Sequence, residues 1–313
     1  MKKVLIATTA LIATAGMAAA EINFSGGARF GVRYDESAVA GVQESKITNR
    51  FTVNIDGTAE TDSGVEFFGR VRIRGGNEGN GATGVGALPA NAAPGNTAIS
   101  APRVGARIGG LTIATGNING AIDSLPGLYS GSVGLTGLSY SNVITGGGFD
   151  SFSSNGGGEN GVEVIYSANG LGVHLSHSDV VRAAGAAATR RTALGLSYAF
   201  GDWNVALGLH DGDVASEDFA VISATGSIGS VSLGLQLVDN DANTGGIRIS
   251  AGFEVGAATN VTVFIADRDA GAGPDTAYGL GFTHSLGGAT LAGGIVSDAA
   301  GATHADLGVR FNF

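Results

Sequence analysis

Arginine is concentrated in the first third of this chain, at spacings that would place many guanidinium groups on one side of a sheet. The sequence holds 14 arginines, and eight of them lie between residues 29 and 107. These eight are Arg29, Arg33, Arg50, Arg70, Arg72, Arg74, Arg103 and Arg107. Alternate residues of a strand share a face, and a guanidinium group stays charged at any physiological pH. The pattern therefore predicts a permanently positive wall, the alternative being the solvated face of a soluble sheet.

Carboxylates are concentrated elsewhere, in segments that read as loops. They are Asp179, Asp211, Asp213, Glu217, Asp218, Asp239, Asp241, Asp267, Asp269, Asp275 and Asp298. Calcium accepts six to eight oxygen ligands, so an acidic cluster could hold it. The best candidate set is Asp211, Asp213, Glu217 and Asp218, although no calcium-loop motif supports it and ordinary solvated loops are the alternative. No cofactor is required by any other pattern in the chain.

An enzymatic reading of the histidines finds little support. His174 and His177 are three residues apart, so a strand would point them to opposite faces and they could not chelate one ion. The chain has no nucleophile elbow and no phosphate-binding loop, and it lacks cysteine. Cysteine-based metal sites and disulfides are thereby excluded. We predict that the protein is not an enzyme.

The first twenty residues have the order of a secretory signal peptide. Lys2 and Lys3 precede an apolar segment that ends in small residues, which predicts cleavage before Glu21. The mature chain then has 15 basic and 27 acidic residues, a net charge of −12. Nucleic acid is therefore not expected as a partner.

Residues 21–313 read as one all-β domain. Residues 50–56 alternate strictly, with Phe51, Val53 and Ile55 on one face and polar side chains on the other, and residues 305–313 repeat this pattern. No mature segment reaches the length of apolar sequence that a membrane-spanning helix requires. A chain of positive mean hydropathy can still cross a membrane as a closed β-barrel, in which neighbouring strands satisfy every backbone group.

The turns supply the number of strands. Seven short turns are expected near residues 57–63, 109–110, 169–170, 201–202, 229–230, 256–259 and 287–288. Eight longer connections alternate with them, at about 35–45, 75–100, 117–159, 179–190, 211–217, 239–245, 267–275 and 298–302. Fifteen connections join sixteen antiparallel strands, an even number that is typical of bacterial outer-membrane barrels. A soluble β-sandwich would also alternate, but three arginines on one strand face argue against it.

Several segments make the chain resemble the general diffusion porins of Gram-negative bacteria, of the alphaproteobacterial type found in photosynthetic species. They are GARFGVRYDE, NRFTVNIDGTAETDSGVEFFGRVR, GLTIATGNINGAIDS, DRDAGAGPDTAYGLGF and ADLGVRFNF. The resemblance implies homotrimers of sixteen-stranded transmembrane barrels in the outer membrane, in contact with lipids and lipopolysaccharide. It also implies that the third outer loop folds inward and narrows the pore between loop carboxylates and wall arginines.

Carried over by position, the infolded constriction loop is about 117–159, and Asp123 is its acidic constriction residue. The next carboxylate, Asp150, is far along the loop, which departs from the several loop acids that the family often has. On the opposite wall, the arginines near mid-strand are the expected constriction residues: Arg29, Arg50, Arg70, Arg72 and Arg107.

The resemblance implies passive diffusion of small hydrophilic solutes and ions through a water-filled channel. Two alternatives remain open at this point. A substrate-selective channel would need a ladder of aromatic side chains along the lumen, and a barrel that acts mainly as a surface adhesin would conduct no ions.

Overall fold

The computed structural model describes residues 20–37, 39, 41, 43–77, 96–145, 147–154, 160–180, 189–241, 245–268 and 276–313. The predicted signal peptide, apart from Ala20, lies outside the described residues. Among the described residues, no helix is long and apolar enough to cross a membrane.

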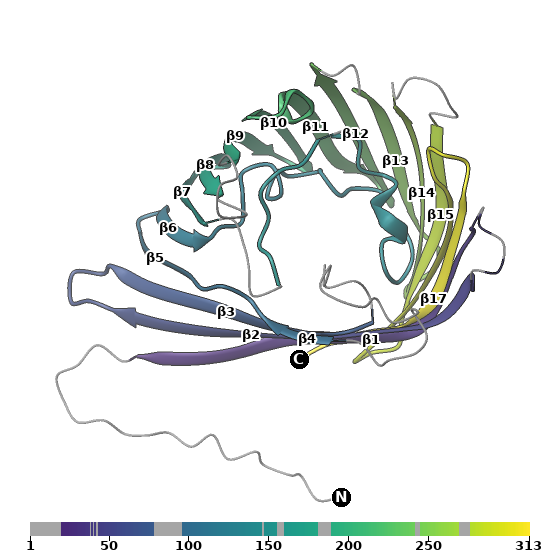
Figure 1. Cartoon of the computed structure of the whole chain (residues 1–313), viewed down its shortest axis with the longest axis horizontal. Coiled ribbons are helices and arrows are strands. Elements are labelled where there is room, and N and C mark those ends of the chain that lie inside the picture. The colour runs from purple at the N-terminus through teal and green to yellow at the C-terminus, as the bar shows by residue number, and fades with distance from the viewer. Residues whose placement is uncertain are drawn as a thin grey trace, which may run out of the picture.

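One closed antiparallel sheet forms the molecule, and Figure 1 shows it as a ring viewed along the lumen. Its strands are β1 (Glu21–Asp35), β2 (Ser45–Glu60), β3 (Glu66–Gly76), β4 (Asn96–Ile99), β5 (Arg103–Ile108), β6 (Leu111–Asn117), β7 (Asn160–Ala168), β8 (Leu171–Val180), β9 (Thr189–Phe200), β10 (Trp203–Gly212), β11 (Phe219–Ile228), β12 (Val231–Asn240), β13 (Gly246–Glu254), β14 (Thr259–Arg268), β15 (Thr276–Ser285), β16 (Thr290–Ser297) and β17 (Thr303–Asn312). Two short 3-10 turns, η1 (Leu138–Tyr140) and η2 (Ala215–Glu217), lie between strands.

The barrel has sixteen strands because β4 and β5 are two parts of one. Both pair with β3, β4 with its end near Ile73 and β5 with its beginning near Glu66. Pro102 stands in the break and has no N–H to give to a ladder. Ser100 bridges the gap, since its backbone N donates to Arg72 O at 2.8 Å and its Oγ accepts from Arg72 N at 2.9 Å. The predicted strand number is confirmed.

The connections fall where the glycine-rich turns predicted them. Gly110, Gly170 and Gly201 have positive φ at three of the short turns, a conformation that glycine adopts without steric cost. The first short turn is later than expected, because β2 continues to Glu60 and Thr61 O accepts from Gly64 N at 2.9 Å.

The seam between β1 and β17 closes the ring. Arg29 pairs with Arg310 across it, and Gly26 and Phe313 exchange backbone hydrogen bonds at 2.9 and 3.1 Å. At the other end of the seam, His304 Nδ1 lies 2.9 Å from Asp35 Oδ1 and His304 Nε2 lies 3.1 Å from Asp298 Oδ2. One imidazole thus ties β1, β17 and the loop after β16 together.

We expect the Asp298 carboxylate to make this seam sensitive to acid. Burial alone would raise the pKa of Asp298, but hydrogen bonds from His304, Ala302 and Ala300 outweigh it and hold the pKa below its ordinary value. A group with a lowered folded pKa stabilises the fold above its unfolded pKa, and this contribution is lost as the pH falls below about 4. Asp298→Asn should lower stability at pH 7 by about 1 kcal/mol or less, since the side chain is partly exposed and solvent screens its charge.

Thermal denaturation at pH 7 and pH 3 measures this effect. The difference between wild type and Asp298→Asn should be smaller at pH 3, because at that pH the unfolded chain largely binds a proton at Asp298 and part of the stabilisation is lost. A difference that is equal at the two pH values would contradict the assignment.

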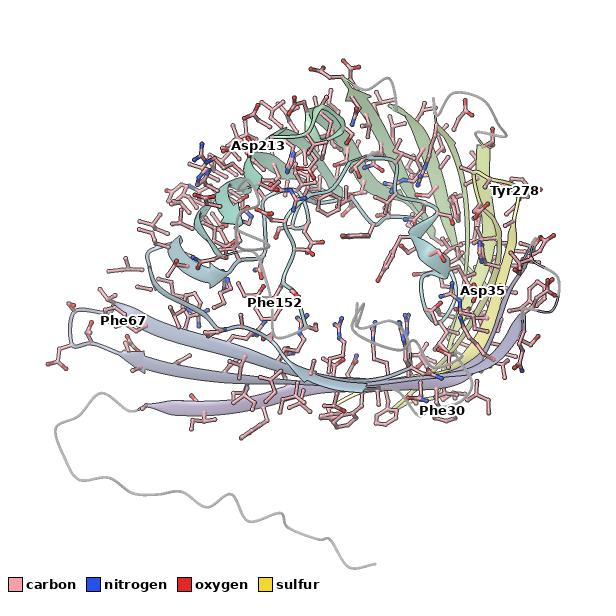
Figure 2. The ribbon with its side chains drawn as sticks, in the orientation of Figure 1. Phe30, Asp35, Phe67, Phe152, Asp213 and Tyr278 are labelled. Carbon is pink, nitrogen blue, oxygen red and sulfur yellow. The ribbon has the colours of Figure 1, made fainter. Side chains whose placement is uncertain are left out.

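Large apolar side chains cover the outside of the ring. The side chains of Phe24, Phe30 and Phe67 are 62%, 57% and 52% exposed, whereas their neighbours Asn23, Ser25 and Arg29 line cavities inside the barrel. Figure 2 shows the labelled Phe30, Phe67 and Tyr278 on the outer surface. An outward apolar band with a polar interior is the pattern of a barrel that faces lipid.

The main apolar core lies inside the barrel, between the long loop after β6 and the wall strands β9 to β16 along which the loop runs. The loop contributes Ile118, Ala121, Ile122, Leu125, Leu128, Val133, Leu135, Leu138 and Ile144, all buried. Val238 and Phe264 point inward, which breaks the polar-lumen pattern, because they belong to this core and pack against the loop. Each fully buried aliphatic side chain stabilises the packing by about 1.5–3 kcal/mol.

Glycines on the wall let the loop come close. A β-carbon placed on Gly294 would lie 2.8 Å from the backbone N of Gly134, and one on Gly308 would lie 2.6 Å from a methyl group of Leu135. Contacts that short are not tolerated, so a larger residue at either position would push the loop into the lumen. Part of the unusual glycine content therefore serves the attachment of the loop.

Candidate functional site

The loop that follows β6 runs inside the barrel. Figure 1 shows this teal segment within the ring, along the wall formed by β7 to β15, and facing the strands β1 to β4 across the lumen. Backbone hydrogen bonds three residues apart tighten it into successive turns, for example Leu125 N to Ile122 O at 2.9 Å and Leu128 N to Leu125 O at 3.1 Å. The predicted infolding of this connection is confirmed.

The start of the loop is attached to a buried carboxylate. Glu163 on β7 is completely buried; its Oε1 accepts from Arg103 Nε at 2.5 Å. Its Oε2 lies 2.9 Å from His174 Nε2 and accepts from the backbone N of Asn119 at 3.2 Å. His177, by contrast, is exposed and lies 2.9 Å from Thr192 Oγ1, so the two histidines point to opposite faces as predicted.

The middle of the loop is held by Arg248 of β13, which is completely buried. Its Nη1 donates to Leu128 O at 2.7 Å and Asn142 O at 3.1 Å, and its Nη2 donates to Gly127 O at 2.6 Å and Ser130 Oγ at 3.1 Å. Among the described residues Arg248 forms no ion pair. One guanidinium group thus joins two passes of the loop to the wall.

The far end of the loop is attached at the seam. Asp306 of β17 accepts from the backbone N atoms of Leu135 and Thr136 at 2.8 and 2.7 Å, and from Thr136 Oγ1 at 2.7 Å. Arg29 Nη1 donates to Leu135 O at 3.0 Å, and Arg33 Nη2 donates to Ser139 Oγ at 2.8 Å. Leu138, Ser139 and Tyr140 all have positive φ there, a strained backbone that these contacts must hold.

The returning part of the loop is attached by a second buried ion pair. Arg191 donates to both carboxylate oxygens of Glu217 at 2.9 and 2.6 Å, and to Asp150 Oδ1 of the loop at 3.3 Å. All three side chains are buried. Asp150 is therefore neutralised at the wall and does not serve the lumen.

The lumen side of the loop carries Asp123, two tyrosines and Phe152. Tyr129 Oη donates to Asp123 Oδ1 at 2.5 Å, and the Tyr129 and Tyr140 rings meet edge to face with centroids 5.6 Å apart. Burial raises the pKa of Asp123, although the hydrogen bond from Tyr129 and the charge of Arg72 act against the rise. Asp123 thus lies within electrostatic reach of the arginine wall.

Three of the five predicted constriction arginines lie together opposite this loop. Arg29, Arg50 and Arg72 line one cavity of about 710 Å³. Two further arginines, Arg74 and Arg310, line the same cavity. Figure 2 shows nitrogen-tipped side chains along this wall that point into the lumen, with the labelled Phe152 beside them. The Arg72 guanidinium lies 4.5 Å from the Phe152 ring centroid and donates to Ser154 Oγ at 3.3 Å.

The other two predicted arginines lie at a different level. Arg70 and Arg107 line a separate cavity of about 490 Å³ together with Arg103 and Glu66. Arg70 makes two hydrogen bonds to Asp56, at 2.6 and 3.0 Å, and Arg107 forms an ion pair with Glu66. The predicted wall is thus divided between two cavities, and only the first faces the loop acid.

The predicted calcium ligands do not converge. Glu217 is turned toward Arg191, and Asp213 Oδ2 accepts from the backbone N of Arg190 at 2.7 Å. Asp218 Oδ1 accepts from Gly212 N at 2.8 Å, and Asp211 and Asp218 line a cavity of about 410 Å³. Within the described part of the chain, no three histidine, aspartate or glutamate side chains are placed to hold one metal ion.

Several residues of the site escaped the sequence analysis. Arg310 belongs to the arginine cavity, and Arg248, Asp306 and Glu163 hold the loop. Each is a charged residue at an inward position of its strand. Strand alternation could have placed them inward, but it could not show which of them meets the loop.

The chain is similar to known proteins along almost its entire length. A profile of the family described as Gram-negative porin matches residues 7–300. The porin of Fuscovulum blasticum is 28% identical over 314 residues, which cover 94% of this chain and 100% of that protein. Solved structures of engineered variants of Rh. blastica porin superpose with TM-scores of 0.77 and 0.76, at 26% and 27% identity, and each covers 94% of this chain and 100% of the other.

Proposed function

This chain belongs to the Gram-negative porin family and is a diffusion channel of the outer membrane, and from that premise we propose how its pore is organised. The passage for solutes is the lumen between the infolded loop and the β1–β4 wall. Small polar solutes and ions pass without a chemical step, so no catalytic residue is needed. The channel works after export, with residues 1–20 removed as a signal peptide.

Three copies assemble into a homotrimer in contact with membrane lipids and lipopolysaccharide. Support comes from the relatedness to porins along 94% of the chain and from the outward apolar band. Phe24, Phe30 and Phe67 would be covered by lipid or by a neighbouring copy. The outer loops would face the exterior.

Asp123 of the loop and the arginines opposite it form the narrowest, most strongly charged section of the pore. The observation that supports this proposal is the 710 Å³ cavity lined by Arg29, Arg50 and Arg72. Surface charges are screened over about 8 Å at physiological salt, so charges beside the passage affect an ion more than the acidic outer rim does. Charged side chains beside a narrow section are a usual means of selecting solutes in channels.

Recording from purified protein in planar bilayers tests the proposal. A trimer of open channels should insert with current that closes in three equal steps, and conductance should rise with salt concentration. A pore that saturates with one neutral sugar would favour the substrate-selective alternative. Protein that inserts but conducts no current would favour the adhesin alternative and contradict ours.

A further inference from the structure

Charge is unequal on the two sides of the narrowed lumen. The cavity of about 710 Å³ opposite the loop is lined by five arginines, and none of its described lining side chains is a carboxylate. Its other polar lining residues include Ser25, Thr52 and Asn54, which carry hydroxyl and amide groups. Such a surface offers hydrogen-bond donors and positive charge to an anion.

The arginines come from strands that are adjacent in the closed ring. Arg310 of β17 pairs with Arg29 of β1, which in turn pairs with Arg50 of β2, so three guanidinium-bearing residues follow one another across the seam. Arg72 and Arg74 come from β3, which is paired with β2. The arrangement is a band across four strands and is not a scatter of surface charge.

At least part of this band keeps its positive charge toward the lumen. Arg72 donates to the neutral acceptors Asn54 Oδ1 at 2.9 Å and Ser154 Oγ at 3.3 Å. Arg310 is exposed at the cavity. Neutral acceptors orient a guanidinium group but leave its charge available to a passing anion.

The loop side carries little negative charge to balance the band. Between residues 118 and 154 the acidic residues are Asp123 and Asp150. Asp150 lies 3.3 Å from Arg191 Nη1 at the wall, and Asp123 accepts from Tyr129 at 2.5 Å. Among the described residues of the loop and of this cavity, Asp123 is therefore the one acidic side chain left to balance the charge of Arg72 and Arg310.

We propose that this arginine-lined cavity is a binding site for small carboxylate and phosphate anions, and that it makes the channel prefer anions to cations. The inference rests on the proposed position of the constriction. The two oxygens of a carboxylate, or two oxygens of a tetrahedral phosphate, match the forked donors of arginine, so these anions bind more strongly than chloride does. An anion that dwells there should also obstruct the flow of smaller ions.

Reversal potentials across a KCl gradient measure the preference, and blockade of KCl current by added citrate or inorganic phosphate measures the binding. Wild type should pass chloride more readily than potassium, and citrate should block it at lower concentration than phosphate. The double variant Arg72→Gln/Arg310→Gln should lower the chloride-to-potassium permeability ratio by about threefold or more, as expected for two charges removed beside the passage. Its blockade by citrate should weaken in parallel.

Arg190→Gln is the matched control, because Arg190 is exposed on the outer rim and its Nε lies 4.0 Å from Asp179. It should leave both readouts unchanged. A second double variant, Arg72→Lys/Arg310→Lys, keeps both positive charges and should retain the chloride preference. Its blockade by citrate should weaken, because lysine lacks the forked donors of arginine. This double variant and the single Arg310→Gln variant decide the question if the double glutamine variant does not assemble.

A wild-type channel that prefers potassium, or variants whose reversal potential and citrate blockade equal those of wild type, would overturn the inference while the diffusion channel stands. Absence of any conductance would instead count against the proposed function. If citrate blocks Arg72→Gln/Arg310→Gln as strongly as wild type, the binding site lies elsewhere, and this result would also overturn the inference.

Discussion

Replacing Arg248 with methionine is expected to detach the middle of the loop from the wall. The guanidinium group supplies four hydrogen bonds to Leu128, Asn142, Gly127 and Ser130. Methionine fills a similar volume but donates nothing, and each buried acceptor left without a donor costs about 1–3 kcal/mol. The loop should then move in the lumen, so single-channel current should become noisy and the loop should become sensitive to protease.

The barrel itself should remain assembled in this variant, because the strand ladders do not depend on Arg248. Limited proteolysis and current noise are therefore better readouts than yield. Arg248→Lys keeps one donor group, so its current noise and protease sensitivity should lie between those of wild type and Arg248→Met. Arg190→Met on the outer rim should resemble wild type. A quiet, protease-resistant Arg248→Met channel would show that apolar packing alone holds the loop.

The strands were predictable from the sequence because two local signals agree along the chain. Alternation placed Phe51 outward and Arg50 inward, and glycine-rich turns fixed where each strand ends. The break between β4 and β5 was missed, although Pro102 stands in it. A proline marks an interruption only when the pairing of the neighbouring strand is known, and that pairing is not local information.

The position of each arginine along the barrel axis was less predictable than the side of the strand from which its side chain projects. Alternation gives the inward side of a strand, but neighbouring strands of a barrel are staggered, so the height of a residue depends on the register of the complete sheet. Arg70 and Arg72 are therefore in different cavities although they are two residues apart on β3. Arg310 was missed for the same reason, since only closure of the ring brings it opposite Arg29.

Loop attachment was the least predictable part of the site. The inward Val238 and Phe264 depart from the alternation that gives a polar lumen, because the apolar face of the loop covers them. The wall in effect has two kinds of inward surface. Strands β1 to β3 carry arginine toward the open lumen, while β12, β14 and β15 carry apolar residues such as Val238, Phe264 and Ala277 toward the loop.

Replacing Glu163 with leucine is expected to give the largest loss of stability, because it leaves a buried charge without its partner. Glu163 holds Arg103 at 2.5 Å, His174 at 2.9 Å and the backbone N of Asn119 at 3.2 Å, and it is completely buried. Removing one member of a buried ion pair costs about 3–5 kcal/mol. The thermal denaturation temperature should fall clearly, and the start of the loop at Asn119 should become mobile.

A double-mutant cycle separates the cost of leaving the buried Arg103 unpaired from the cost of changing the volume of the Glu163 side chain. Arg103→Met/Glu163→Leu should recover much of the stability, because a buried pair can often be replaced by apolar residues of similar size at little cost. The Arg107 and Glu66 pair provides the matched control: it joins the same kinds of side chain, but they are 54% and 30% exposed. Glu66→Leu should cost about 1 kcal/mol or less, as exposed pairs do. If Glu163→Leu and Glu66→Leu lower the denaturation temperature equally, or the double variant is no more stable than Glu163→Leu, the buried pair does not anchor the loop.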